Sequence, residues 1–201
     1  MVRSAALRRT ALAWLIALPA LAAAAAAYAG PFEDGKAAFD RGDAAGAFRT
    51  WKPLAEEGDQ TAQFWLGQMY DLGKGVPQDH AQATQWYRRA AEQGNLMAQH
   101  NLANMYETGE GLRPSDYSLS AAASWYRRAA EHGFKPSQAN LGLLIANGRG
   151  VRRDFVEAYM WMLLAGSIAD ANREALTKRM TPQQIAEAER HARDWQPKSD
   201  Q

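Results

Sequence analysis

The chain of 201 residues contains no cysteine, so no disulfide can stabilise it and its fold has to be held together by packing. It also lacks an excess of charge of one sign, because 23 basic residues are matched by 22 acidic ones. A protein without a basic field has no general electrostatic attraction for nucleic acid or for an anionic bilayer. We therefore expect no nucleic-acid partner.

The motifs of common catalytic sites are missing as well. Neither Ser-x-x-Lys nor Lys-Thr-Gly occurs, and there is no Gly-x-Ser-x-Gly nucleophile turn. The histidines show no pairing at metal-ligand spacing (His80, His100, His132 and His191). The segment Gly73-Lys74-Gly75 lacks the Lys-Ser/Thr ending of a phosphate-binding loop. The sequence therefore predicts no catalytic, cofactor-binding or metal-binding residue.

A long apolar run occurs at the N-terminus. Three arginines precede the run from Ala11 to Ala27, which ends in the small-x-small site Ala27-Tyr28-Ala29. This layout predicts a secretory signal peptide at 1–29, cleaved after Ala29, and hence a periplasmic or secreted protein. The alternative is an uncleaved membrane anchor, since the run approaches spanning length. In that case the membrane would be contacted through this segment alone.

A motif that recurs at a fixed step is the main positive feature. Its first copy contains Ala62, Leu66, Gly67, Tyr70, Gly73 and Gly75, and the second, 36 positions later, contains Ala98, Leu102, Ala103, Tyr106, Gly109 and Gly111. The third copy lies another 39 positions on and contains Leu141, Gly142, Gly148 and Gly150. Such periodicity is the signature of stacked helix pairs, so we predict an all-α fold, an α/α superhelical solenoid.

Each copy predicts two helices with defined ends. In the first copy Gly73 suits the left-handed cap of the first helix. Asp79 then begins the second helix as its N-cap, with Gln82 as its capping-box partner. Asp154 and Glu157 are the corresponding capping box of the third copy.

The second helix of each copy carries a stripe of alanines and aromatic residues at helical spacing, with Trp86, Trp125 and Trp161 at equivalent places. A single helix pair cannot cover both sides of such a stripe, so neighbouring copies have to supply the other wall. The stripe predicts that Trp125→Ala destabilises the array by about 3–5 kcal/mol.

The sequence on either side of the copies extends the array. The segment 32–58 reads as a shorter helix pair, and Thr181-Pro182 reads as the start of a polar capping helix. The predicted segments after the signal are a tetratricopeptide-like helix pair at 30–59, repeats at 60–95, 96–134 and 135–170, capping helices at 171–195 and a disordered tail at 196–201.

The pattern Ala-x3-Leu-Gly-x2-Tyr-x2-Gly-x-Gly-Val-x2-Asp-x3-Ala-x2-Trp-x3-Ala-Ala-x2-Gly is matched by Ala62 to Gly94. It resembles the Sel-one-like repeat (SLR) family, a branch of the tetratricopeptide-like superfamily. The resemblance implies a superhelical adaptor, and for an exported bacterial member it implies regulation of envelope signalling, polysaccharide secretion or host interaction. A disulfide-rich subgroup is linked to β-lactam hydrolysis, but the cysteine pairs of that subgroup are absent here.

The resemblance also implies that the first helix of each pair lines a concave, ligand-binding surface. The candidate protein-binding residues are Phe64, Trp65, Gln68, His100, Asn101, Asn104 and Asn140. Asn and Gln side chains both donate and accept hydrogen bonds, which suits the backbone of an extended peptide. Trp65 would be an apolar anchor; the alternative is that it packs against the preceding helix pair.

We therefore expect a non-enzymatic scaffold that binds a protein or peptide in the bacterial cell envelope. Two alternatives stay open. One is an envelope glycan-binding protein or hydrolase that uses Trp65 with the Asn and Gln side chains, and the other is a structural spacer in a larger complex.

Overall fold

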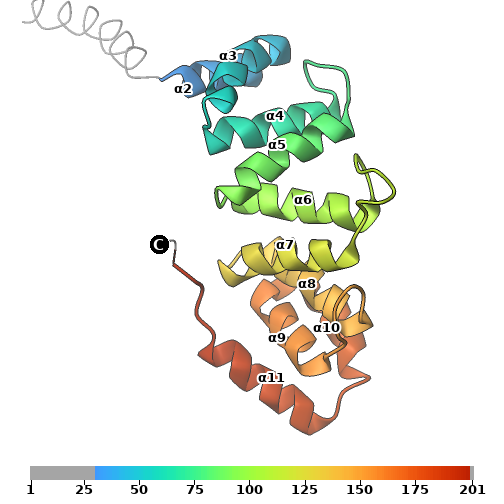
Figure 1. The fold of residues 1–201 in the computed structure, drawn as a ribbon. Helices are drawn as coiled ribbons and strands as arrows, with labels where there is room; N and C mark the ends of the chain where they lie inside the picture. The colour runs from blue at the N-terminus through green and yellow to red at the C-terminus, as the bar shows by residue number, and fades with distance from the viewer. Residues whose placement is uncertain (1–29, 200–201) are drawn as a thin grey trace, which may run out of the picture.

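The computed structural model describes residues 30–199, and every regular element in that range is a helix (Figure 1). The helices are α2 (Pro31–Asp40), α3 (Ala44–Glu56), α4 (Gln60–Leu72), α5 (His80–Glu92), α6 (Leu96–Thr108), α7 (Leu119–Glu131), α8 (Lys135–Asn147), α9 (Phe155–Ala165), the 3-10 helix η1 (Gly166–Ala169), α10 (Asp170–Thr177) and α11 (Pro182–Asp194). The predicted signal peptide at 1–29 lies outside the described residues. None of the described helices has the length and apolar character that crossing a bilayer requires.

The helices form one continuous stack of antiparallel pairs (Figure 1). The three repeats correspond to α4 with α5, α6 with α7, and α8 with α9, and α2 with α3 precedes them. The second helix of each pair also packs on the first helix of the next pair, while α11 packs on α9 and ends the stack. The predicted α/α solenoid is confirmed.

Polar side chains begin most of these helices. The residues Asp59, Asp79, Asn95, Ser118 and Asp154 each accept a hydrogen bond from the backbone N–H three residues further on. Such a bond satisfies one of the free N–H groups of the first turn. The complete capping box predicted for Asp154 and Glu157 is wrong, because the Glu157 carboxylate instead accepts from Arg127 at 2.6 Å and Trp161 at 3.2 Å.

A buried glutamine joins each repeat to the helix before it. Gln63, Gln99 and Gln138 donate from Nε2 to the carbonyl oxygens of Ala55, Ala91 and Ala130, at 3.0, 3.1 and 3.1 Å. These bonds lie at equivalent places in the three repeats. An unpaired buried carbonyl would be costly, so each bond fixes how one pair is set against the next.

The second glycine of each Gly-x-Gly loop also lies where two helix pairs meet. We call these glycine contacts and the glutamine bonds the joints between successive pairs. Gly111 has a φ of +67°, and a Cβ atom at this position would overlap the His80 carbonyl oxygen at the start of α5. Gly75 and Gly150 lie equally close to the backbone at the starts of α3 and α7. The Gly-x-Gly loop is therefore glycine-rich because backbone meets backbone there, as well as for its left-handed turn.

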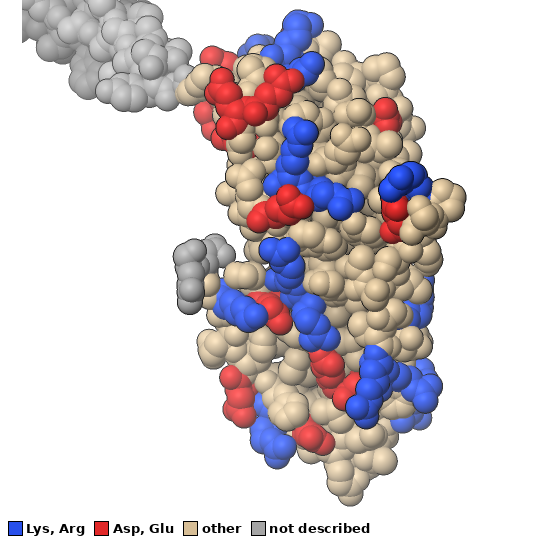
Figure 2. All heavy atoms as spheres, viewed as in Figure 1, with Lys and Arg blue, Asp and Glu red and all other residues tan. Residues whose placement is uncertain are grey.

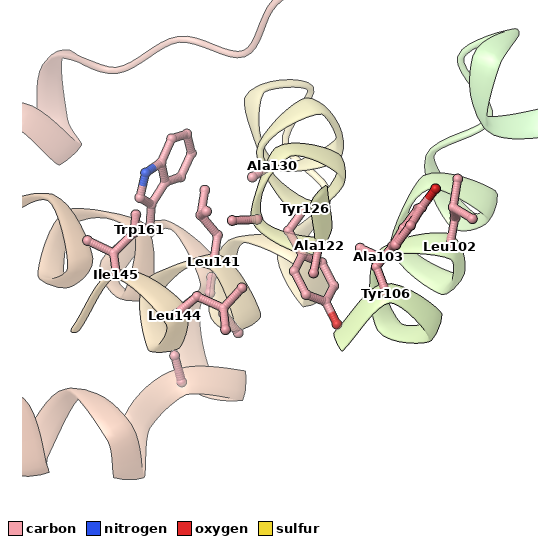
Figure 3. Packing of buried hydrophobic residues seen from close by; sticks show 14 of the residues in the cluster. Leu102, Ala103, Tyr106, Ala122, Tyr126, Ala130, Leu141, Leu144, Ile145 and Trp161 are labelled. Carbon is pink, nitrogen blue, oxygen red and sulfur yellow. The ribbon is translucent and has the colours of Figure 1, made fainter. Parts of the chain in front are cut away.

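The aromatic stripe forms the core as predicted, with one exception. Figure 3 shows Tyr126 of α7 between the side chains of α6 and those of α8, in a core that also contains Trp161. Trp86 and Trp161 are buried, but Trp125 is only half-buried, and the Arg128 guanidinium stacks over its ring at 4.5 Å. The sequence-based estimate for Trp125→Ala is therefore too large.

The segment after α11 differs from the expected disordered tail. Within the described part of that tail, residues 196–199, the Lys198 N–H donates to the Glu131 carbonyl oxygen at 2.8 Å. The tail thus returns along the stack to the end of α7 (Figure 1). Residues 200–201 lie outside the described residues.

Candidate functional site

The candidate binding residues come from α4, α6 and α8, the first helices of the three repeats. Their exposed and half-buried members form a surface that we call the first-helix face: Trp65, Gln68, His100, Asn101, Asn104 and Asn140. Two groups of polar side chains are organised around this face, and each contains one of the predicted asparagines.

Asp71, at the end of α4, is the centre of the first group. Its carboxylate accepts a hydrogen bond from the Tyr87 hydroxyl at 3.3 Å and lies 2.9 Å from Nδ1 of His80. The Asn101 side chain of α6 lies near the same hydroxyl and acts to lower its pKa. We call these four residues the first polar cluster. The Asp71 side chain is 27% exposed, so a ligand on the face can reach it.

Glu107, at the end of α6, occupies the equivalent place one repeat further along. Its carboxylate accepts from the Tyr126 hydroxyl at 3.2 Å and from the Arg149 guanidinium at 2.9 Å. Asn140 of α8 lies near the Tyr126 hydroxyl and acts to lower its pKa. These four residues form the second polar cluster, in which the Glu107 side chain is 22% exposed.

The environment keeps both tyrosines protonated. Burial raises the pKa of Tyr87, and the nearby Asp71 carboxylate raises it further, while the Asn101 side chain acts in the opposite direction. Burial raises the pKa of Tyr126 in the same way; there the Asn140 side chain opposes the shift and Glu107 adds to it. Each hydroxyl therefore stays a donor to its carboxylate at neutral pH.

The asparagines were predicted from the sequence, but their partners were missed. The tyrosines were assigned to the buried stripe, and their rings are indeed buried. The hydroxyl groups nevertheless reach the acids at the ends of α4 and α6. A signal was present, because Asp71 and Glu107 both directly follow the Tyr of the repeat motif, 36 positions apart.

The third repeat has no such cluster. Ala146 stands at the place of the acid, Met162 at the place of the tyrosine, and both are buried. The polar clusters are thus a property of the first and second repeats.

Two predicted contact residues belong to the packing of the N-terminal pairs. Phe64 is 4% exposed and its ring lies 6.0 Å from that of Tyr87, so it is not available to a ligand. Trp65 is half-buried and stacks on Trp51 at 5.2 Å, with Phe39 at 5.5 Å on another side. The alternative of packing against the preceding pair therefore describes Trp65, since rings from α2 and α3 surround it.

The remaining candidates differ in exposure. His100 of α6 is half-buried against α7 and α8, with Nδ1 3.0 Å from the Ser137 hydroxyl and its ring 5.4 Å from that of Tyr126. Burial lowers the pKa of His100 below its ordinary value. Gln68 is half-buried and Asn104 is exposed, so both remain accessible on the first-helix face.

Charged residues are spread over the surface without a field of one sign. Figure 2 shows Lys and Arg alternating with Asp and Glu down the length of the stack. Several of these charges have structural partners, such as Arg89 over the ring of Trp86 at 4.5 Å. Among residues 30–199, no group of three or more His, Asp or Glu side chains is arranged to hold a metal ion.

Stacked helix pairs with repeated joints define a helical repeat protein. The sequence profile of the Sel1 repeat matches residues 60–95, 96–134 and 135–168, which is more than half of the chain. The protein therefore belongs to the Sel1 repeat family. Proteins of this family are in general scaffolds for protein–protein interaction rather than catalysts.

Two of the solved structures that are similar to this chain illustrate the match. The Sel1 repeat protein from Oxalobacter formigenes is 31% identical with a TM-score of 0.64, over 69% of this chain and 58% of that one. The second is c5321, a protective antigen present in uropathogenic Escherichia coli strains displaying an SLR fold; it is 28% identical with a TM-score of 0.47, over 75% of this chain and 40% of that one. The match thus spans less than two thirds of the length of either relative. No curated protein matches the sequence.

Proposed function

We propose that this protein is a non-catalytic scaffold of the bacterial cell envelope that binds an extended segment of a partner protein on the first-helix face. The two polar clusters carry the proposal. They present the same set of groups, an acid, a tyrosine hydroxyl and an asparagine amide, at equivalent places in two successive repeats.

The asparagines have hydrogen-bonding capacity left for a ligand. Asn101 and Asn140 each lie near a tyrosine hydroxyl, and an amide side chain offers two N–H donors and a carbonyl oxygen. A peptide backbone presents complementary N–H and C=O groups at every residue. Two such amides in successive repeats suit an extended segment better than a small, compact ligand.

The tyrosine and the acid hold each amide in place. Because the Tyr87 hydroxyl is held by Asp71 and lies near Asn101, it restricts the asparagine, which then loses little further rotamer freedom on binding. The same reasoning applies to Asn140 in the second cluster. Pre-organised polar groups bind more tightly than mobile ones of the same chemistry.

Export rests on the N-terminal sequence. A basic start, an apolar run and the small-x-small site at Ala27-Tyr28-Ala29 support a cleaved signal peptide. The test is the N-terminal sequence of the protein recovered from a periplasmic fraction, which we expect to begin at Gly30. A chain that begins at Met1 and stays in the cytosolic fraction would contradict export.

The binding proposal is tested with the double variant Asn101→Ala/Asn140→Ala. The immobilised chain is used to isolate a partner from the envelope of its own organism, and the purified partner is then titrated against each protein. We expect the double variant to bind about tenfold more weakly, since each lost hydrogen bond contributes about 0.5–1.5 kcal/mol. The control is Gln85→Ala on the exposed side of α5, with unchanged affinity expected.

Two results would contradict the proposal. One is a partner that binds the double variant as tightly as the original chain. The other is a rise in melting temperature with intact envelope glycan fragments while no protein is retained, which would favour the glycan-binding alternative.

A further inference from the structure

The chain's own C-terminal segment shows how a peptide docks at the end of a second helix. The Lys198 N–H donates to the Glu131 carbonyl oxygen at 2.8 Å, and its ammonium lies 2.5 Å from the Glu131 carboxylate. Pro197 and Trp195 lie beside Gly133, because a Cβ atom at this glycine would be 3.7 and 3.9 Å from their side chains. The end of α7 thus binds an extended Trp-x-Pro-Lys segment.

The surface that receives this segment is repeated 39 positions earlier in the sequence. Residues 125–133 read WYRRAAEHG and residues 86–94 read WYRRAAEQG, with a single difference, His132 for Gln93. Both helices end in the same way: the backbone N–H of the residue after the helix donates to the carbonyl of Ala91 in α5 and of Ala129 and Ala130 in α7. In both, an arginine stacks over the tryptophan at 4.5 Å.

The two ends differ in what covers them. Glu131 is paired with Lys198, whereas Glu92, at the equivalent place in α5, is exposed and forms no ion pair with any residue in 30–199. A Cβ atom on Gly94 would meet nothing within 4 Å, in contrast to Gly133. The end of α5 is therefore an open copy of a surface that is covered at α7.

A polar groove of about 560 Å³ connects the two ends. Its lining residues are Gln60, Glu92, Gln93, Gly94, Gln99, Arg128, Glu131, His132 and Lys198. Gln99 is 3% exposed, and its Oε1 atom has no hydrogen-bond partner within the described residues. In the first repeat the corresponding oxygen, on Gln63, accepts from Gln93 at 2.8 Å. The groove is thus continuous with the tail-binding surface and contains an unsatisfied acceptor in its wall.

We infer that the end of α5 is a binding site for an extended, lysine-bearing segment of a partner protein. The lysine ammonium pairs with the Glu92 carboxylate and its backbone N–H donates to the Glu92 carbonyl oxygen, as Lys198 does at Glu131. A proline or aromatic residue before the lysine lies over Gly94. The exposed Glu92 carboxylate favours a positively charged segment.

This site is separate from the first-helix face, because it is formed by the C-terminal ends of second helices. The test therefore does not depend on the proposed function. The probe is a fluorescently labelled, end-capped peptide with the sequence of Asp194–Ser199, titrated against the whole chain. We expect one saturable site, weakened about threefold by Glu92→Gln, as a partly exposed ion pair predicts. The matched control is Glu110→Gln, an exposed acid in the α6–α7 loop, with unchanged affinity expected.

A second variant tests the equivalence of the two ends. Lys198→Ala removes the ion pair at Glu131, so we expect the number of bound peptides per chain to rise from one to two, and to return to one when Glu92→Gln is added. A peptide in which norleucine replaces the lysine should bind more weakly than the original.

Several results would overturn the inference. The first is the absence of saturable binding at millimolar peptide. The second is equal affinity of the original chain and of Glu92→Gln for the peptide. The third is a single peptide site in both the original chain and Lys198→Ala. Self-association of the chain that Lys198→Ala abolishes would show that the occupant is the tail of a second copy and not a partner protein.

Discussion

The first two repeats and the third repeat are the same structural unit with different surfaces. In residues 60–134, an acid at the end of the first helix meets a tyrosine of the second helix, and an asparagine of the following repeat completes the cluster. In residues 135–168 these places hold Ala146 and Met162, and the second helix is covered by α11. Polar groups occupy these places where the face is open, and apolar groups occupy them where the stack ends.

The joints do not share this difference. The buried glutamine and the second loop glycine occur in all three repeats, at Gln63, Gln99 and Gln138 and at Gly75, Gly111 and Gly150. Stacking therefore demands the same residues everywhere, whereas the exposed face is free to vary. Variation between repeats thus separates residues that hold the array from residues of the first-helix face, on which we propose that a partner binds.

The largest expected effect contrasts the tryptophans of the second and third repeats. Trp161 is 3% exposed and covered by Trp195, so we expect Trp161→Ala to destabilise the protein by about 3–5 kcal/mol. Trp125 is half-buried, and Trp125→Ala should cost only about 1–3 kcal/mol. Urea unfolding followed by circular dichroism measures both. Equal losses would mean that the third repeat is no better packed than the second.

A joint should be nearly as sensitive as the core. Gly111→Ala forces a left-handed alanine and an overlap with the His80 carbonyl, so we expect a loss of about 2–4 kcal/mol. The matched control is Gly94→Ala, where φ is +97° but nothing lies within 4 Å, with a loss of about 1 kcal/mol expected. If the two variants unfold at the same urea concentration, the loop is not a joint.

The polar clusters should contribute less to stability than to binding. Tyr87→Phe and Tyr126→Phe each remove one hydroxyl that donates to an acid, so we expect a loss of about 0.5–1.5 kcal/mol per variant. Partner affinity should fall with both variants, since the asparagines lose their fixed orientation. Unfolding and titration of the same samples check this, and affinity that is unchanged in both would show that the clusters are structural only.

The smallest effect concerns pH and His100. Burial lowers the pKa of His100 in the folded protein, so the unfolded chain binds the proton more readily. The stability that neutral His100 contributes is fully present above about pH 6.5 and is lost as pH falls from there towards the lower folded pKa. We expect His100→Gln to lose less stability than the original chain between pH 7.5 and 5.5. Parallel losses in the two proteins would contradict this.

Most of the fold was predictable because its signals are local. Helix ends follow from capping residues and loop glycines, and the 36- and 39-residue steps reveal the pairing of helices. The capping box at Asp154 was mispredicted because Glu157 is used by Arg127, a residue 30 positions away. Trp125 was placed too deep because periodicity gives the direction of a side chain and not what covers it.

The repeat, the all-helical class, the helix pairs and the positions of Asn101 and Asn140 on the first helices could all be predicted from local sequence signals. Only the packed stack brings Asp71 to Tyr87, Trp65 onto Trp51 and Lys198 to Glu131. The two groups of features differ in the range of the interactions that fix them. Helix formation and capping act over a few residues, whereas these contacts join residues 14 to 67 positions apart and exist only once the pairs have stacked.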